Sequence, residues 1–140
     1  MKAIIYHSMS KHGRSKKIAN EIDGDHFQII PTRKPIKFIP FQMIYYGYLT
    51  VLNKEAPINK IDIDFDKYDE IVLVSPVWAG RANAYMRQFL KEYEFHGKKV
   101  SIIGSCDGGY DKYFASFKGL IDGCNDIIER SVYVKGIKVN

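Results

Sequence analysis

Short apolar runs rich in strand-forming residues alternate with segments of helical periodicity along the whole chain. The runs are KAIIY (2–6), HFQII (26–30), EIVLVS (70–75), KVSIIG (99–104) and RSVYV (130–134). The third and fourth are almost continuously apolar, as expected of strands buried on both faces of a parallel sheet. Strands that alternate with helices are typical of βαβ units. The sequence therefore predicts an α/β domain with a doubly wound, five-stranded parallel sheet.

Four segments with apolar residues at helical spacing lie between these runs. Their ranges are 13–23, 41–53, 83–93 and 110–122. A doubly wound sheet carries helices on both faces. After the fifth run only KGIKVN remains, so the last helix is expected to be short or missing. We expect one side of the fifth strand to be bare or covered by a second copy of the chain in a homodimer.

The chain of 140 residues fits one domain, 1–140, and its 46% hydrophobic content is enough for a core. No apolar run approaches the roughly 20 residues of a membrane span, and the amino-terminal apolar run is too short for a signal peptide. The two cysteines, Cys106 and Cys124, form no disulfide or metal-binding pattern. A cytoplasmic protein with free thiols is expected.

The net charge of +5 favours anionic partners, but the lysines and arginines are spread along the chain. No basic block is interleaved with aromatic residues, so nucleic acid is not an expected partner.

The stretch HSMSKHGRS (7–15) follows the first run and precedes a predicted helix. A helix start at the carboxyl end of a strand offers unpaired N–H groups to an anion, and phosphate is the expected guest. Gly13 lets the backbone approach that guest closely. The side chains that we expect to contribute are those of Ser8, Ser10, Lys11, His12, Arg14 and Ser15.

Two other phosphate-binding loops are excluded by their residues, and a third is present with an altered nucleophile position. The sequence contains neither G-x-x-x-x-G-K-[ST] nor G-x-G-x-x-G. His7-Ser8-x5-Arg14-Ser15 looks like the tyrosine-phosphatase loop with serine in place of the nucleophilic cysteine. That chemistry needs a thiolate. The loop is therefore expected to bind phosphate without cleaving it.

The stretch YHSMSKHGRSKKIA also resembles the phosphate loop of the flavodoxin family, S-x-T-G-x-T, which holds the phosphate of FMN. Ser8, Ser10, Gly13 and Ser15 match when Lys11 and His12 are treated as an insertion. The longer form is similar to the subgroup that includes quinone-dependent protoporphyrinogen oxidases.

The segment 68–93 gives the most specific match. It resembles the flavodoxin-like pattern S-P-[IV]-W-x-G followed by a helix with M-R-x-F-L. The resemblance extends over about residues 1–135 and implies the strand order 2-1-3-4-5. It also implies that the flavin ring is flanked by Pro76, Val77, Trp78, Ala79 and Gly80.

The segment 97–110 looks like the next strand of that family and its ring-binding loop. The loop residues are Ser105, Cys106, Asp107, Gly108 and Gly109, and Tyr113 or Tyr110 is a candidate second aromatic contact. Cys106 is interpreted as a packing residue rather than a redox thiol. In the family's strand order the three loops converge on one pocket.

The resemblance implies an FMN-binding redox protein that passes electrons to a partner protein or a small quinone-like acceptor. The flavin then supplies the chemistry, and no catalytic side chain or metal is expected. Two alternatives remain open: an FMN-dependent quinone or protoporphyrinogen-type oxidoreductase, and a non-redox module that binds a phospholigand. The chain departs from the acidic carriers of this family in being basic, with a pI of about 9.1.

Overall fold

The computed structural model describes residues 1–8, 13–32, 56–78, 80–121 and 123–139. The helix expected at 41–53 lies outside these residues. In the described part of the chain, no helix is both long and apolar enough to cross a membrane.

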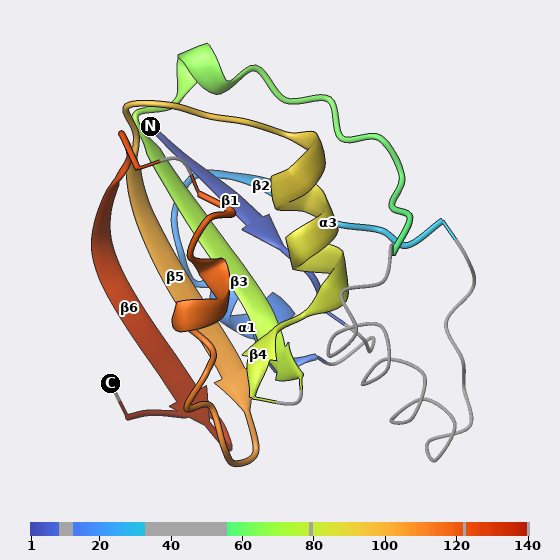
Figure 1. Ribbon diagram of the computed structural model, residues 1–140, viewed down its shortest axis with the longest axis vertical. Helices are drawn as coiled ribbons and strands as arrows, with labels where there is room; N and C mark the ends of the chain where they lie inside the picture. The colour runs from blue at the N-terminus through green and yellow to red at the C-terminus, as the bar shows by residue number, and fades with distance from the viewer. Residues whose placement is uncertain (9–12, 33–55, 79, 122, 140) are drawn as a thin grey trace.

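A mainly parallel sheet forms the centre of the molecule (Figure 1). Its parallel strands are β1 (Lys2–Tyr6), β2 (Asp25–Gln28), β3 (Glu70–Trp78), β5 (Lys99–Cys106) and β6 (Asp126–Val134). They lie side by side in the order β2-β1-β3-β5-β6. The predicted α/β class and parallel sheet are therefore confirmed.

Two short antiparallel strands extend the sheet beyond the five that the sequence predicts. They are β4 (Arg81–Ala82), which pairs with β3, and β7 (Ile137–Lys138), which pairs with β6. The described residues thus form a seven-stranded sheet, and the predicted number of five was too low. Each added strand has only two residues and no apolar run, so hydrophobic patterning gives no signal for it.

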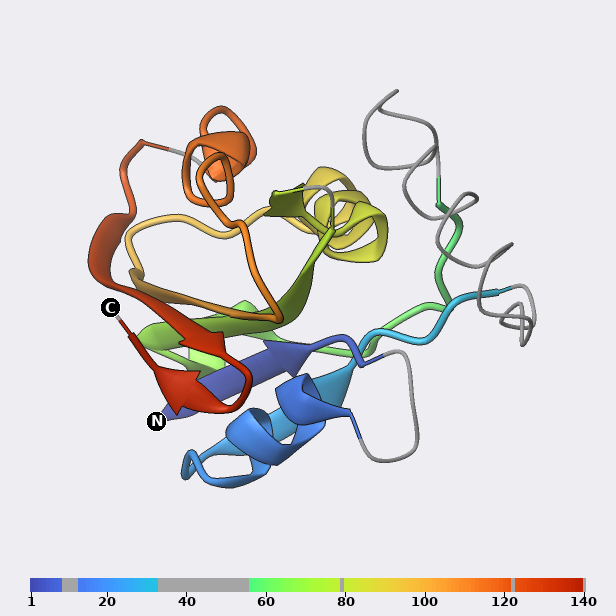
Figure 2. The same cartoon turned by 90° about the horizontal axis from the view of Figure 1, so that it is seen from below.

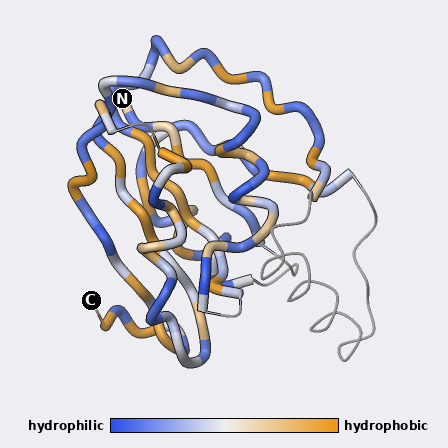
Figure 3. The backbone as a smooth tube through the Cα atoms, viewed as in Figure 1, coloured by the Kyte–Doolittle hydropathy of each residue, from blue (hydrophilic) through white to orange (hydrophobic). Residues whose placement is uncertain are grey.

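The two described α-helices lie on opposite faces of the sheet (Figure 2). Helix α1 (Arg14–Asn20) covers the face on which Ile4 and Val72 lie. Helix α3 (Ala84–Glu92) packs on the face that carries Ile5 and Leu73. Because side chains alternate along a strand, each buried run supplies both layers of the core. Figure 3 shows hydrophobic stretches, in orange, along the central strands.

Helix α3 begins where the sequence predicts. Asn83 caps it: the side-chain oxygen of Asn83 accepts a hydrogen bond from Met86 N at 2.8 Å. This bond satisfies one of the N–H groups that have no partner within the helix. Met86 and Phe89 are completely buried beneath the helix. The cap fixes the start of α3 beside the end of β3.

The helix expected at 110–122 is not formed, and this prediction was wrong. Only a 3-10 turn, η2 (Ala115–Phe117), lies there. Tyr113 and Phe117 are buried as their spacing suggests, but Gly119 has a φ of +83°. In addition, the Ser116 hydroxyl accepts a hydrogen bond from Ala82 N at 2.8 Å. This side-chain bond to the β4 strand and the turn at Gly119 end the helical geometry after a few residues.

No helix follows β6 in the described residues; a hairpin takes its place, in agreement with the expected missing helix. Lys135 and Gly136 form its turn with positive φ angles of 51° and 84°. Ser131 donates a hydrogen bond to Glu129 on β6, and Lys138 pairs with the same carboxylate at 3.5 Å. Because these β6 side chains are polar and already paired, they need no apolar helix to cover them.

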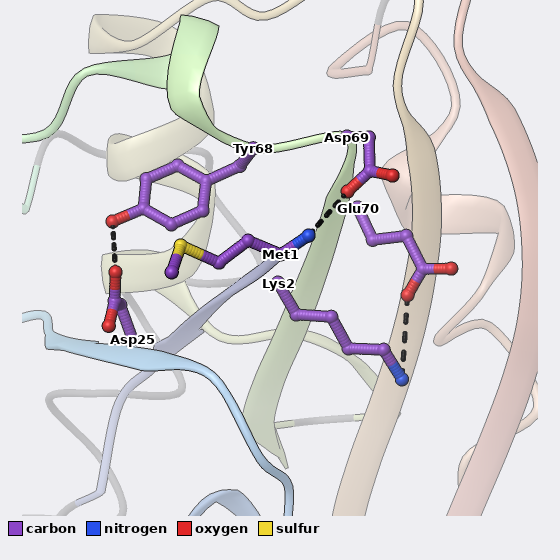
Figure 4. A network of polar contacts seen from close by, with 6 residues as sticks. All are labelled: Met1, Lys2, Asp25, Tyr68, Asp69 and Glu70. Atoms are coloured by element: carbon purple, nitrogen blue, oxygen red, sulfur yellow. Dashed lines mark hydrogen bonds and ion pairs between the residues drawn. The ribbon is translucent and has the colours of Figure 1, made fainter.

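Polar contacts join the starts of β2, β1 and β3 (Figure 4). The amino-terminal ammonium of Met1 lies 3.0 Å from Asp69, and Lys2 pairs with Glu70 at 3.4 Å. The Tyr68 hydroxyl donates to Asp25 at 2.6 Å, and this hydrogen bond raises the pKa of Tyr68 to about 12. These contacts lie at the amino ends of the strands and leave their carboxyl ends to the loops described next.

Candidate functional site

A surface depression of about 290 Å³ lies at the carboxyl ends of β1, β3 and β5. Strand β1 lies between β2 and β3 in the sheet. These two strands come next in the sequence and lie on opposite sides of β1, so the strand order reverses here. Such a reversal leaves a crevice outside the strand ends, where open α/β sheets bind ligands. The three segments expected to converge all contribute to its lining.

The first wall comes from the segment between β1 and α1. Its described lining residues are Ser8, Gly13, Arg14 and Ser15. The helix starts after Gly13 with no side-chain cap and no acidic residue in its first turn. Within the described residues, no capping side chain therefore satisfies its first N–H groups. The predicted residues Ser10, Lys11 and His12 lie outside the described residues.

The second wall comes from the end of β3. Pro76, Val77 and Trp78 line the depression, as residues of the strand itself, and β3 then turns into β4. Gly80 makes this turn with a φ of +72°, a conformation that other residues rarely adopt. Ala79 lies outside the described residues. The sequence therefore identified the position of this wall but not its extended hairpin geometry.

Trp78 is half-buried on this wall. Its indole makes edge-on contacts with the rings of His7 and Tyr85, both with centroid distances of 5.8 Å. Edge-on packing of this kind holds an aromatic ring in one orientation. Trp78 is thus supported from the core side while part of its surface faces the depression.

The third wall comes from the end of β5. Ser105, Cys106 and Asp107 line the depression. The Cys106 thiol donates a hydrogen bond to Gly108 O at 3.1 Å, which supports its interpretation as a structural residue. Gly108 and Gly109 do not line the depression, although a Cβ atom built on either would meet nothing within 4 Å. These glycines leave open space beside the wall.

One ion pair joins the first wall to the third. The Arg14 guanidinium contacts the Asp107 carboxylate, and both side chains are largely exposed. Arg14, which the sequence assigns to phosphate binding, therefore also pairs with a carboxylate from the opposite loop.

Tyr113 does not take the position expected of it. Its side chain is completely buried, and its hydroxyl lies 2.9 Å from Ser75 Oγ and 3.3 Å from Ile103 O. Burial is the main reason that the pKa of this phenol is raised. A ring in this place supports the floor beneath β3 and β5 but cannot stack on a ligand in the depression, so its assignment as a ring contact is corrected.

His7 supports the Trp78 wall from the core, and the sequence did not indicate this role. It is only 2% exposed, and its Nδ1 lies 2.6 Å from Asn83 Nδ2. The Asn83 oxygen already accepts from Met86 N, so its amide nitrogen is the group that donates to His7. His7 Nδ1 must then be unprotonated and the ring neutral. Burial lowers the pKa of His7 to about 4, which agrees with this assignment.

Comparison with known proteins places this geometry in a fold. No protein-family model matches the chain, and no curated protein matches it by sequence. Among solved structures, a flavoprotein from Lactobacillus acidophilus in complex with FMN aligns with a TM-score of 0.74. The identity is 22%, over 94% of this chain and 91% of that one. This chain has a flavodoxin-like fold.

Two chains described as flavoproteins from Bacteroides share the flavodoxin-like fold. The one from B. eggerthii has a TM-score of 0.74 and 14% identity, over 94% of this chain and 86% of its own. The one from B. uniformis has a TM-score of 0.66 and 15% identity, over 96% and 92%.

Proposed function

We propose that this protein binds FMN in the depression and serves as an electron carrier. The observation that carries the proposal is that the three segments singled out by sequence line one depression. The chain also has the fold of a flavoprotein that was crystallised with FMN. Bound flavin would supply the electron chemistry, and the protein would supply grip and orientation.

The residues around the depression fit the two ends of FMN. Ser8, Arg14 and Ser15 offer hydroxyl and guanidinium donors for the phosphate. Trp78 and the backbone of 105–107 offer a rigid aromatic surface and polar groups for the flat ring. Ser10, Lys11 and His12 remain part of the proposed phosphate loop on the basis of the sequence. Ala79, Gly80, Gly108 and Gly109 remain part of the proposed ring site on the same basis.

The ionisable side chains at and beneath the depression already have partners, beginning with Asp107, which pairs with Arg14. His7 is buried, neutral and held by Asn83, and the Cys106 thiol is bonded to Gly108 O. This supports a carrier that exchanges electrons with a redox partner protein or a small quinone-like acceptor. Turnover of a quinone by the FMN-loaded protein would instead identify it as an oxidoreductase.

The test is a visible-spectrum titration of the purified chain with FMN. We expect saturable binding with a shifted flavin band and reversible reduction of the bound flavin. Cys106→Trp places bulk inside the depression and should abolish this binding. The matched control is Cys124→Trp, because Cys124 is exposed and does not line the depression. If the unmodified chain takes up no FMN, or Cys106→Trp binds it equally well, the proposal is wrong.

A further inference from the structure

A second cavity, of about 650 Å³, lies away from the depression, between η2 and the β5–β6 part of the sheet. Figure 2 shows the orange turn of η2 standing above this end of the sheet. Above the cavity, residues 110–121 form turns and the 3-10 helix η2 in place of the expected helix. Its volume falls within the range of about 300–1,000 Å³ that small-molecule sites occupy.

The interior of this cavity is apolar. Ile102 and Ile127 come from the sheet, and Phe114, Phe117 and Ile121 come from the segment above it. Ile102 and Phe117 are nearly buried, whereas Phe114, Ile121 and Ile127 are half-buried and present apolar surface to the opening. A ligand that fills this space would bury hydrocarbon surface on both sides.

The rest of the lining consists of two cations from different elements and of Ala115, Gly119, Gly123 and Asn125. Arg130 lies on β6 directly beside Ile102 of β5, at the register position where the two side chains share a face. Lys118 follows η2 on the other wall. Within the described residues, neither side chain forms an ion pair with a carboxylate. Both Lys118 and Arg130 are exposed, so the two positive charges lie at the rim of the cavity.

We propose that this cavity binds a small amphipathic carboxylate, with its hydrocarbon part against Ile127 and Phe114 and its carboxylate between Lys118 and Arg130. The charge complementarity selects an anion over a neutral lipid-like molecule. The apolar lining selects a chain or ring over an inorganic anion. The site is separate from the proposed FMN site, and its occupation does not depend on that proposal.

The test uses octanoate as the probe and octanamide as its neutral analogue, added to the full chain with FMN present. Nuclear magnetic resonance of isoleucine δ-methyl groups reports the position. Octanoate should shift the signals of Ile121 and Ile127 and leave those of Ile4 and Ile18, which lie on the α1 face. Calorimetry should give at least tenfold weaker binding for octanamide.

The double variant Lys118→Gln/Arg130→Gln should weaken octanoate binding at least tenfold. Its matched control is Lys16→Gln/Lys17→Gln on α1, which removes the same charge from the opposite face and should change nothing. The proposal is overturned if millimolar octanoate leaves the Ile121 and Ile127 signals in place, or if the two double variants bind alike. It is also overturned if sedimentation shows a dimer that closes the cavity against octanoate.

Discussion

The Nδ1 atom of His7 lies 2.6 Å from the Nδ2 atom of Asn83, and this contact joins the end of β1 to the start of α3. Asn83 has two tasks at once, because its oxygen caps the helix and its nitrogen donates to the ring. The pair is buried, so neither group has solvent as an alternative partner. The geometry of the Trp78 wall rests on this pair, since the His7 ring also contacts the indole.

Acid should destabilise the protein through His7. Its pKa is about 4 in the folded state, against the ordinary histidine value of 6.5, so the unfolded chain binds the extra proton between these values. The contribution of His7 to stability is therefore fully present above pH 6.5. The free energy of unfolding falls by about 3 kcal/mol through this group as the pH drops to 4. Urea unfolding at several pH values measures this loss.

His7→Gln should remove this part of the pH dependence. His96→Gln, at an exposed position, is the control and should retain it. An identical pH dependence in the parent chain and His7→Gln would show that another group is responsible.

Removing the Tyr113 hydroxyl should destabilise the floor of the site. Tyr113→Phe leaves the buried Ser75 hydroxyl without this partner, at a cost of about 1–3 kcal/mol. Ser75→Ala should cost a similar amount, and the double variant clearly less than the sum. Chemical denaturation of all four proteins measures the coupling. Additive effects would mean that the two hydroxyls do not support each other.

Bulk at Gly104 should displace the same tyrosine. A Cβ atom at Gly104 would lie 2.7 Å from Tyr113 Cε2 and 3.1 Å from Val77 Cγ2. Gly104→Ala should therefore destabilise the fold by about 1–3 kcal/mol. At Gly123 a Cβ atom meets nothing within 4 Å, so Gly123→Ala should change stability by less than about 0.5 kcal/mol. Equal thermal midpoints for the two variants would contradict this packing.

The Arg14–Asp107 pair should tune affinity for the phosphate of FMN. Asp107→Asn frees the guanidinium and should strengthen FMN binding about two- to fivefold, a modest effect because the pair is exposed. Arg14→Gln should weaken FMN binding. Riboflavin, which lacks the phosphate, should respond to neither change.

Spectral titrations at low salt measure these affinities. Asp126→Asn, at the amino end of β6 and away from the depression, is the charge control. An equal effect of Asp107→Asn on FMN and riboflavin would show that this carboxylate does not compete with the phosphate.

The parallel sheet could be predicted because apolar runs report burial directly. Ala3, Ile5, Val72 and Leu73 are all buried where the runs place them. The convergence of the three segments followed from the expected strand order, and the lining of the depression agrees with it. His7 could have been assigned to the core, since it continues the alternation of Ala3 and Ile5 on one face of β1.

The outcome for residues 110–121 could not be predicted, because their apolar spacing is that of an α-helix and the structure buries the same residues without one. Tyr113 and Phe117 are four residues apart and both are buried. The contacts that decide the outcome, Tyr113 with Ser75 and Ser116 with Ala82, join residues more than 30 positions apart. Hydrophobic spacing reports which residues are buried, but not which distant partner holds them.

Trp78 is the chain's sole tryptophan and lies on the wall of the depression. The tryptophan fluorescence of this protein therefore reports on the depression alone. A flavin bound against the indole would quench this fluorescence by energy transfer. The intrinsic fluorescence of Trp78 can therefore report the binding of a ligand in the depression without an attached dye.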